Sequence, residues 1–166
     1  MSKWRKGVRI TIKVVASGRK WLILMYTGEY NHTIDSKGRM IVPAKFREAL
    51  GESFMITRGV GHCLSIYDMT EWNEYISKLR ALPGNAEAKK MVRFIVAGAI
   101  EAEIDKQGRI LIPANLREWA GLEKDVVLAG MIGCIEVWDK TKWEDTTSFD
   151  DMEDISEHLA DMGLGF

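Results

Sequence analysis

The chain has 166 residues, of which 46% are hydrophobic, so it can form one globular core or two small halves that share one. Its two cysteines are too few for a disulfide framework and indicate a reducing compartment, and no apolar run approaches the roughly 20 residues of a transmembrane helix. The net charge of −1 excludes no class of partner, because local charge patches decide binding to nucleic acids.

Residues 1–24 carry seven Lys and Arg residues and no acidic residue. Three interpretations are open: a basic arm that follows a nucleic-acid backbone, an extra strand over the alternating apolar residues of Val8–Val14, or a leader upstream of a true start at Met25. We favour the last, because Gly18-Arg19-Lys20 can be encoded by purine-rich codons of the kind found in ribosome-binding sites.

An internal repeat is the most informative feature of the sequence. Residues 28–49 align with residues 98–119 at an offset of 70 without gaps, and the match resumes at an offset of 71, where Cys63 corresponds to Cys134. This period exceeds the roughly 20–50 residues of a solenoid unit. Two copies therefore predict a duplicated half-domain whose halves complete each other.

The first unit begins with two predicted strands, Glu29–Ile34 and Met40–Val42, which a short polar loop separates. Gly38 in this loop can adopt a positive φ without a steric penalty, which favours a three-residue hairpin loop with a bulge. A helix is predicted over Pro43–Leu50, because proline fits a first helical turn and Gly51 fits a C-terminal cap.

The rest of the unit is predicted to contain two strands, Phe54–Arg58 and Cys63–Tyr67, and then a helix with Trp72 that either Asp68 or Thr70 caps. Each unit thus has the predicted order β-β-α-β-β-α. The second unit repeats these features at Gly108, Pro113–Ala120, Gly121, Val126–Ala129, Cys134–Trp138 and Asp139 or Thr141.

Between the units, the turn Leu82–Asn85 leads into a predicted helix over Ala86–Ala97 that bridges the two halves. The apolar face of this helix contains Met91, Phe94 and Ile95. Packing of this face in the core is the favoured interpretation, and a surface that binds a partner is the alternative.

Two motifs carry a resemblance to a known family. Asp35-Ser-Lys-Gly-Arg39 and Asp105-Lys-Gln-Gly-Arg109 share an Asp-x-x-x-Arg signature, and each is followed at the same distance by Pro-Ala-x-x-x-Arg-Glu. One such signature alone would have no weight, whereas two copies with the same continuation are specific. Over about residues 25–143, the chain resembles the MraZ family of the AbrB/SpoVT superfamily.

This resemblance implies an α+β fold, a tandem AbrB-like β-barrel of the swapped-hairpin type with flanking helices. It also implies a ring-shaped homo-oligomer, which we expect to be larger than a tetramer. The resemblance further implies binding to repeated short boxes in the promoter of the division and cell-wall gene cluster. The expected parts are an N-terminal extension at 1–24, one repeat at 29–71, connecting helices at 72–99, the other repeat at 100–143 and an acidic tail at 144–166.

The tail carries eight acidic residues and no Lys or Arg. A solvated arm with a short helix over Ile155–Met162 is the favoured interpretation. A DNA mimic that weakens binding is the alternative.

Arg39 and Arg109 lie at the C-terminal ends of the two predicted loops, opposite Asp35 and Asp105 at the N-terminal ends. Each Asp–Arg pair either only pins its loop as an exposed ion pair, or it presents the arginine to DNA, where a guanidinium binds guanine or phosphate. The family resemblance favours DNA contact. The two interpretations are compatible, because the aspartate can orient the arginine.

Lys37 and Lys106 lie on the same loops and are expected to anchor phosphates, with solvated lysines as the alternative. On the predicted helices, Arg47 and Arg117 either face DNA or form a structural ion pair, for which the loop acids are candidates. The residues expected to orient the loops are Asp35, Asp105, Gly38 and Gly108.

The remaining candidate side chains, the cysteines and histidines, indicate no catalytic or metal-binding site. Cys63 and Cys134 occupy equivalent predicted strand positions, where buried cysteines are favoured over metal ligands, and His62 corresponds to Gly133 in the second unit. The sequence shows no nucleophile–base set and no glycine-rich phosphate loop. It therefore predicts no catalysis, no metal and no cofactor.

Together with these features, the family resemblance implies a sequence-specific DNA-binding repressor of the division and cell-wall cluster, including its own promoter. It is expected to act in the cytoplasm in association with the nucleoid, without a membrane or a small-molecule substrate. Two alternatives remain. One is an AbrB-like antitoxin that binds a toxin, and the other is a structural ring protein that does not bind DNA.

Overall fold

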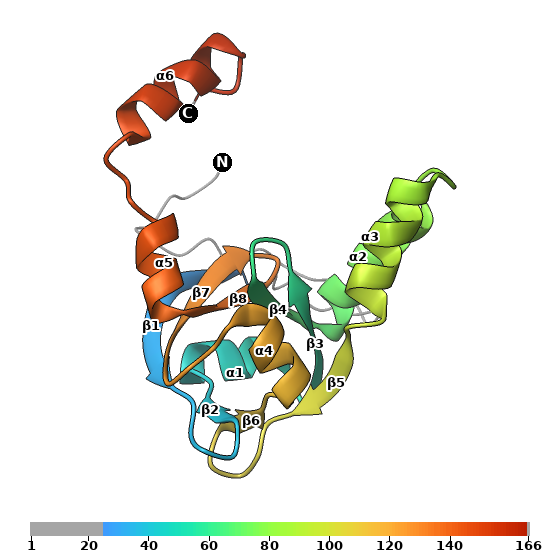
Figure 1. Ribbon diagram of the computed structural model, residues 1–166, viewed down its shortest axis with the longest axis vertical. Coiled ribbons are helices and arrows are strands. Elements are labelled where there is room, and N and C mark those ends of the chain that lie inside the picture. Colours follow the sequence, from blue (N-terminus) through green and yellow to red (C-terminus); the bar gives the residue numbers. More distant parts are fainter. Residues whose placement is uncertain (1–24, 166) are drawn as a thin grey trace, which may run out of the picture.

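A computed structural model describes residues 25–165, so the interpretations of residues 1–24 lie outside the described residues. The order β-β-α-β-β-α occurs twice, with α3 between the units and α6 after them, which confirms the α+β class (Figure 1). The first unit contains β1 (Tyr26–Thr33), β2 (Arg39–Ile41), α1 (Ala44–Leu50), β3 (Ser53–Gly59), β4 (Cys63–Asp68) and α2 (Met69–Arg80). The other elements are α3 (Ala86–Val96), β5 (Ile100–Glu103), β6 (Arg109–Leu111), α4 (Ala114–Ala120), β7 (Asp125–Ile132), β8 (Ile135–Asp139), α5 (Lys140–Thr146) and α6 (Met152–Asp161).

Six strands form one antiparallel sheet in the order β1-β7-β8-β4-β3-β5. The two units exchange strands in this sheet. In the first exchange, β1 pairs along its whole length with β7 of the second unit, from Tyr26↔Ile132 to Thr33↔Asp125. In the other, β5 of the second unit pairs with β3 of the first. Neither unit completes the sheet alone, which confirms that the two halves complete each other.

A separate two-stranded ribbon is formed by β2 and β6, one strand from each unit. Met40 and Ile110 face each other in this ribbon and are fully buried, while their neighbours Ile41 and Leu111 are exposed. The predicted hairpin between β1 and β2 is reduced to a single bridge, from Ile34 to Met40. The main partner of β2 comes from the other unit instead.

Helices α1 and α4 each begin one residue after the proline that was expected in their first turn. Pro43 and Pro113 have extended backbones, with ψ of 138° and 151°, so each proline precedes its helix as the N-cap. Gly51 and Gly121 follow the two helices with φ of 76° and 60°. A positive φ costs glycine little, which explains why both helices end there.

The main core uses equivalent residues from both units. On α1, Phe46 and Leu50 are spaced by one helical turn, and Leu116 and Ala120 occupy the same places on α4. All four are at most 2% exposed and belong to one continuous cluster. Because both helices bury the same face in a shared core, the units fold as one body.

Helices α2 and α3 form a pair that projects from the side of the sheet (Figure 1). Asp68 caps α2 by accepting the backbone N–H groups of Thr70 and Glu71, and Asn85 caps α3 by accepting that of Ala88. A second apolar cluster, separate from the main core, holds this pair together. Its buried members are Trp72, Leu79 and Ile95.

The apolar face predicted for α3 is only partly buried. Ile95 is 2% exposed, Phe94 is half-buried and Met91 is 40% exposed. Core packing was therefore the wrong prediction for Met91, because α2 and β3 cover only one side of this helix. The other side remains an apolar surface.

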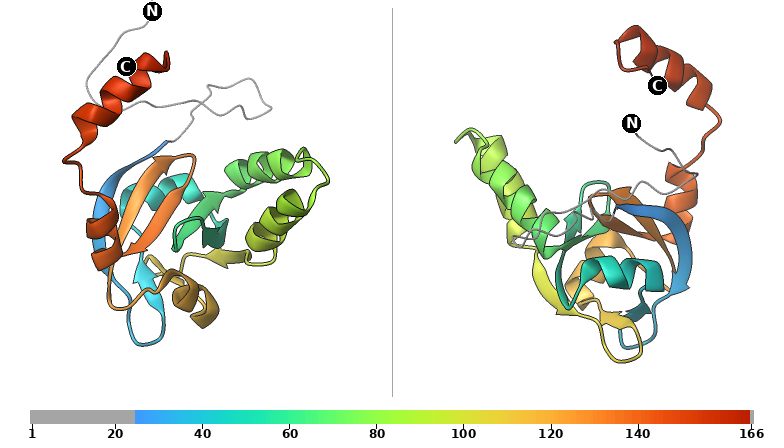
Figure 2. Two further views of the ribbon diagram at one scale, coloured as in Figure 1. Left: turned by 45° about the horizontal axis from the view of Figure 1, so that its top comes forward. Right: turned by 180° about the vertical axis from the view of Figure 1, so that it is seen from behind.

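The two C-terminal helices differ in their contacts. Helix α5 packs beside β7 and β8, whereas α6 extends away from the sheet (Figures 1 and 2). The helix predicted over Ile155–Met162 is thus present as α6, which begins three residues earlier. Among residues 25–165, no helix is long and apolar enough to cross a bilayer.

Candidate nucleic-acid interface

The loop of the first unit is organised by the Asp35 carboxylate. Its Oδ1 atom accepts the backbone N–H groups of Lys37 and Arg39, both at 2.9 Å. Its Oδ2 atom accepts Nε of Arg39 at 2.7 Å. Gly38 has a φ of 82° and donates its N–H to the Asp35 carbonyl, as the predicted three-residue loop with a bulge requires. The side chain of Asp35 therefore shapes the loop and aims Arg39 at the same time.

The loop of the second unit has the same construction. Asp105 Oδ1 accepts the backbone N–H groups of Gln107 and Arg109 at 2.8 Å and 2.9 Å, and its Oδ2 accepts Nε of Arg109 at 2.8 Å. Gly108 has a φ of 77°. The expected Asp–Arg pair is thus present in both loops.

Hydrogen bonds lower the pKa of both aspartates. For Asp35, the main cause of the lower pKa is the hydrogen bond from the backbone N–H of Arg39. Desolvation of the carboxylate raises the pKa in part, and the Arg39 side chain and the backbone N–H of Lys37 lower it further. The same donors at equivalent positions lower the pKa of Asp105 below its ordinary value of 3.8. Both carboxylates are therefore charged at neutral pH and keep their loops in this conformation.

The two loops lie side by side at one end of the molecule (Figure 1; Figure 2, right). Reciprocal backbone hydrogen bonds hold them together, because Val42 donates to the Gly108 carbonyl and Ile112 donates to the Gly38 carbonyl, each at 2.9 Å. Each loop thus accepts a hydrogen bond from the residue that directly follows the ribbon strand (β2 or β6) of the other unit. The pair forms one continuous surface.

Arg47 and Arg117 lie beneath the opposite loops. A Cβ placed on Gly108 would meet Nη1 of Arg47, and a Cβ on Gly38 would lie 3.0 Å from Cζ of Arg117. Nε of Arg117 donates to the Ile112 carbonyl at 3.1 Å. Among the described residues, Nε of Arg47 is buried without a hydrogen-bond partner. Each helix therefore sends an arginine across to the loop of the other unit.

No ion pair of Arg47 or Arg117 with a carboxylate is found in the described part of the chain. The described residues thus contain no example of the structural ion pair that was one of the two interpretations. Both side chains are half-buried. Their guanidinium groups add positive charge directly under the loops.

Arg39 and Arg109 keep much of their hydrogen-bonding capacity. Their side chains are 33% and 26% exposed, and each is held through Nε alone. Within residues 25–165, their terminal nitrogens donate no hydrogen bond. Lys37 and Lys106 are exposed on the same loops. The surface can therefore offer two oriented guanidinium forks and two exposed ammonium groups to an anion.

The crossing of Arg47 and Arg117 to the opposite loops was not foreseen from the sequence. A signal was present, because each loop glycine and each helix arginine recurs at an offset of 70. The offset shows that the residues are equivalent. It does not show that each helix serves the other unit's loop, which depends on the strand exchange.

The cysteines lie away from this surface. Cys63 is fully buried in β4, and burial raises the pKa of its thiol to about 12. The prediction that Cys134 is a buried strand residue is wrong, since Cys134 is only partly buried and precedes β8. It lies in the turn between β7 and β8, where its carbonyl accepts the N–H of Met131. His62 stacks on Trp119. In the described residues no group of three or more His, Cys, Asp or Glu side chains could hold a metal ion.

Comparison with known proteins agrees with this architecture. A family model described as "MraZ protein, putative antitoxin-like" matches the chain twice, over residues 25–95 and 95–164. The transcriptional regulator MraZ of Lachnoclostridium phytofermentans is 51% identical over 142 residues, which cover 86% of this chain and 100% of that protein. The transcriptional regulators MraZ of Acetivibrio thermocellus and Thermoanaerobacter sp. are 52% and 51% identical over 143 residues, which cover 84% of this chain and 100% of each relative. The chain belongs to the MraZ family.

Proposed function

We propose that this protein is a transcriptional regulator that binds double-stranded DNA through the paired loops. The observation that carries this proposal is the convergence of four arginines and two lysines on two adjacent loops of the same construction. They are Arg39, Arg109, Arg47, Arg117, Lys37 and Lys106. The names of the relatives, which are transcriptional regulators, point the same way.

The roles follow from the chemistry of each group. The guanidinium groups of Arg39 and Arg109 have planar donor forks that match the O6 and N7 acceptors of guanine, so we assign them to base contacts. Lys37 and Lys106 are exposed point charges suited to phosphates, and they add affinity without sequence information. Arg47 and Arg117 support the loops from below and strengthen the local positive field.

We further propose that the protein represses the division and cell-wall cluster, including its own promoter, as a cytoplasmic, nucleoid-associated ring. In this proposal the curved sheet and the β2–β6 ribbon act as the swapped-hairpin barrel of the family. A closed ring larger than a tetramer presents many loop pairs at once, so individually weak contacts bind repeated boxes through effective concentration. Light scattering at micromolar concentration and moderate salt tests the ring, and a monomeric or dimeric mass would contradict it.

Arginine variants test the DNA interface. Arg39→Ala and Arg109→Ala should each remove about 1–3 kcal/mol of discrimination between the DNA upstream of the protein's own gene and a scrambled duplex. The ring multiplies the loss. An exposed ion pair contributes only about 0–1 kcal/mol to stability, so thermal melting should change little. Operator affinity at fixed salt is the measurement.

Asp35→Ala is the matched control, because it breaks the same ion pair but keeps the arginine. It should loosen the loop and weaken DNA binding less than Arg39→Ala does. Unchanged affinity in both arginine variants would remove the loops from the DNA interface, and the structural ring that does not bind DNA would then be favoured.

A second candidate function is an antitoxin-like role, which the description of the matching family model favours. An antitoxin binds DNA through the same loops and also forms a stable complex with a toxin protein. Co-expression with the proteins encoded next to it, followed by purification, separates the two functions. A stoichiometric complex would favour the antitoxin.

A further inference from the structure

The outer face of the β2–β6 ribbon combines charged and apolar side chains. Side chains alternate between the two faces of a strand. The buried residues Met40 and Ile110 therefore define the inner face of the ribbon, which packs in the core. Their neighbours on both strands share the outer face. These are Arg39, Ile41, Arg109 and Leu111.

The register of the ribbon places each arginine next to both aliphatic residues. Arg39 pairs with Leu111 across the ribbon, and Ile41 pairs with Arg109. Opposite Cβ atoms in an antiparallel pair are about 5 Å apart. Residues two positions apart on one strand, such as Arg39 and Ile41, are about 7 Å apart. The outer face is therefore a small chequered surface of two guanidinium groups and two aliphatic side chains.

Both aliphatic side chains are open to solvent. Ile41 is 47% exposed and Leu111 is 57% exposed. A single exposed aliphatic residue is common on protein surfaces and needs no explanation. Here the two residues are equivalent in the two units, at the offset of 70, and both lie on the face that carries Arg39 and Arg109. The ribbon lies at the same end of the molecule as the two loops (Figure 1).

We propose that Ile41 and Leu111 contact the C5-methyl groups of thymines that lie beside the guanines bound by Arg39 and Arg109. The major groove of DNA admits a two-stranded β-ribbon, and the guanine acceptors and the thymine methyl group both lie in that groove. Aliphatic side chains recognise the methyl group by apolar contact. This inference rests on the proposed function, because it requires the loop arginines to bind DNA.

The spacing on the ribbon limits where these thymines lie. The distance of about 7 Å between Arg39 and Ile41 corresponds to about two base-pair steps of 3.4 Å. The distance across the ribbon, from Arg39 to Leu111, is shorter. Each recognised thymine is therefore within about two base pairs of a recognised guanine. The ribbon thus adds sequence information that the exposed loop lysines do not supply.

Replacement of thymine by uracil tests the contact, because uracil forms the same base pair but lacks the C5-methyl group. The probes are the duplex upstream of the protein's own gene, prepared with thymine or with uracil throughout. The full-length natural chain should bind the uracil duplex at least about fourfold more weakly at fixed salt, since burial of one methyl-sized group contributes about that factor.

A double variant with Ile41→Ala and Leu111→Ala shows whether the ribbon senses the methyl groups. It keeps both arginines and removes most of the aliphatic surface. It should bind the thymine duplex more weakly than the natural chain does. Uracil should then weaken its binding by less than about twofold, because the coupled contact is already absent. The salt dependence of binding should stay the same, since no phosphate contact changes.

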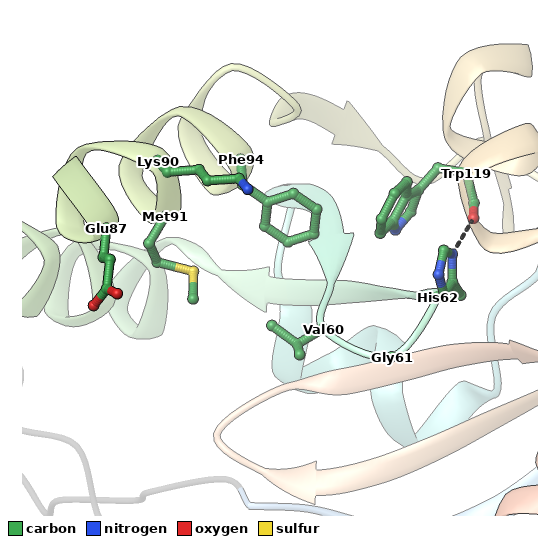
Figure 3. Close-up of a pocket in the computed structure, with 8 residues that line it drawn as sticks. All are labelled: Val60, Gly61, His62, Glu87, Lys90, Met91, Phe94 and Trp119. Atoms are coloured by element: carbon green, nitrogen blue, oxygen red, sulfur yellow. Dashed lines mark hydrogen bonds between the residues drawn. The ribbon is translucent and has the colours of Figure 1, made fainter.

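Val60→Ala is the matched control, because it also shortens an exposed aliphatic side chain. Val60 is 71% exposed in the turn between β3 and β4, outside the ribbon and its loops. There it lines an apolar groove of about 330 Å³ with Met91, Phe94 and Trp119, where the turn meets α3 and α4 (Figure 3). This variant should bind both duplexes as the natural chain does.

The possible outcomes separate this inference from the proposed function. If the natural chain binds both duplexes equally, or if uracil weakens the natural chain and the double variant by the same factor, the methyl contact is overturned and DNA binding stands. If the natural chain binds neither duplex, the proposed function is overturned as well. Light scattering on the double variant gives a further check. A particle smaller than that of the natural chain would show that a neighbouring copy covers this face, which also overturns the contact.

Discussion

The two units of the chain are nearly interchangeable at their loops and differ around them. Asp35 and Asp105 accept the same three donors at distances that differ by 0.1 Å or less. At the periphery, α2 has 12 residues but its counterpart α5 has 7, and Ala49 stands where the second unit has Trp119. The doubled centre therefore supplies the candidate DNA surface, and the unequal periphery supplies the groove.

The loops themselves differ in what lies beneath them. A Cβ on Gly38 would lie 2.9 Å from the backbone carbonyl of Ile112, whereas the three atoms nearest a Cβ on Gly108 all belong to the Arg47 side chain. The backbone carbonyl directly after the ribbon strand β6 cannot move far, but the guanidinium end of a side chain can. The same loop conformation is thus more tightly enclosed in the first unit.

The largest expected effect comes from the loop glycines. Gly108→Ala should cost about 1–2 kcal/mol of unfolding free energy, because alanine is forced to a positive φ. Gly38→Ala should cost at least about 1 kcal/mol more, since the overlap with the Ile112 backbone adds to the same strain. Chemical denaturation of both variants measures the difference. Equal costs would show that the two loops are enclosed equally.

The arginines beneath the loops give a smaller difference. Arg117→Met breaks the hydrogen bond to the Ile112 carbonyl and should cost about 1 kcal/mol of stability. Arg47→Met removes a buried Nε that has no partner among the described residues, so it should cost less or stabilise. Methionine keeps the apolar stem in both variants, which isolates the guanidinium. Thermal melting checks the order, and a larger loss for Arg47→Met would reverse the comparison.

The smallest effect concerns pH. The folded protein lowers the pKa of Asp35 and of Asp105 below 3.8, so their stabilising contribution is present above the unfolded pKa. It is lost as the pH falls through the folded pKa. Unfolding free energy should therefore decline below about pH 4, and less steeply in a double variant with Asp35→Asn and Asp105→Asn. An unchanged slope in the double variant would exclude these carboxylates as the cause.

Much of the fold was predictable because its signals are local. Gly38 and Gly51 mark a loop and a helix end through the backbone conformations that only glycine adopts without cost. Phe46 and Leu50 mark a helix face through their spacing. The order β-β-α-β-β-α and the loop conformation followed from such signals. So did the Asp–Arg pair within each loop, whose partners are four residues apart.

Two wrong predictions, for Met91 and Cys134, show what local sequence signals do not determine. Met91 has the spacing of a core residue, yet it is exposed because a helix face is buried only where another element covers it. The equivalence with Cys63 predicts that Cys134 is a strand residue, yet Cys134 lies in the β7–β8 turn, where its carbonyl accepts a backbone hydrogen bond. Spacing defines a face or a strand, and the neighbouring elements decide what covers it.

The sequence by itself determined the two loops, the elements around them and their equivalence, since each depends on residues close together in the chain. Only the tertiary structure decided that β1 pairs with β7 and β2 with β6, because strand partners are chosen by burial over the whole body. That exchange brings Arg47 under Gly108 and Arg117 under Gly38. The same long-range packing leaves one side of α3 uncovered beside Trp119, and so creates the groove.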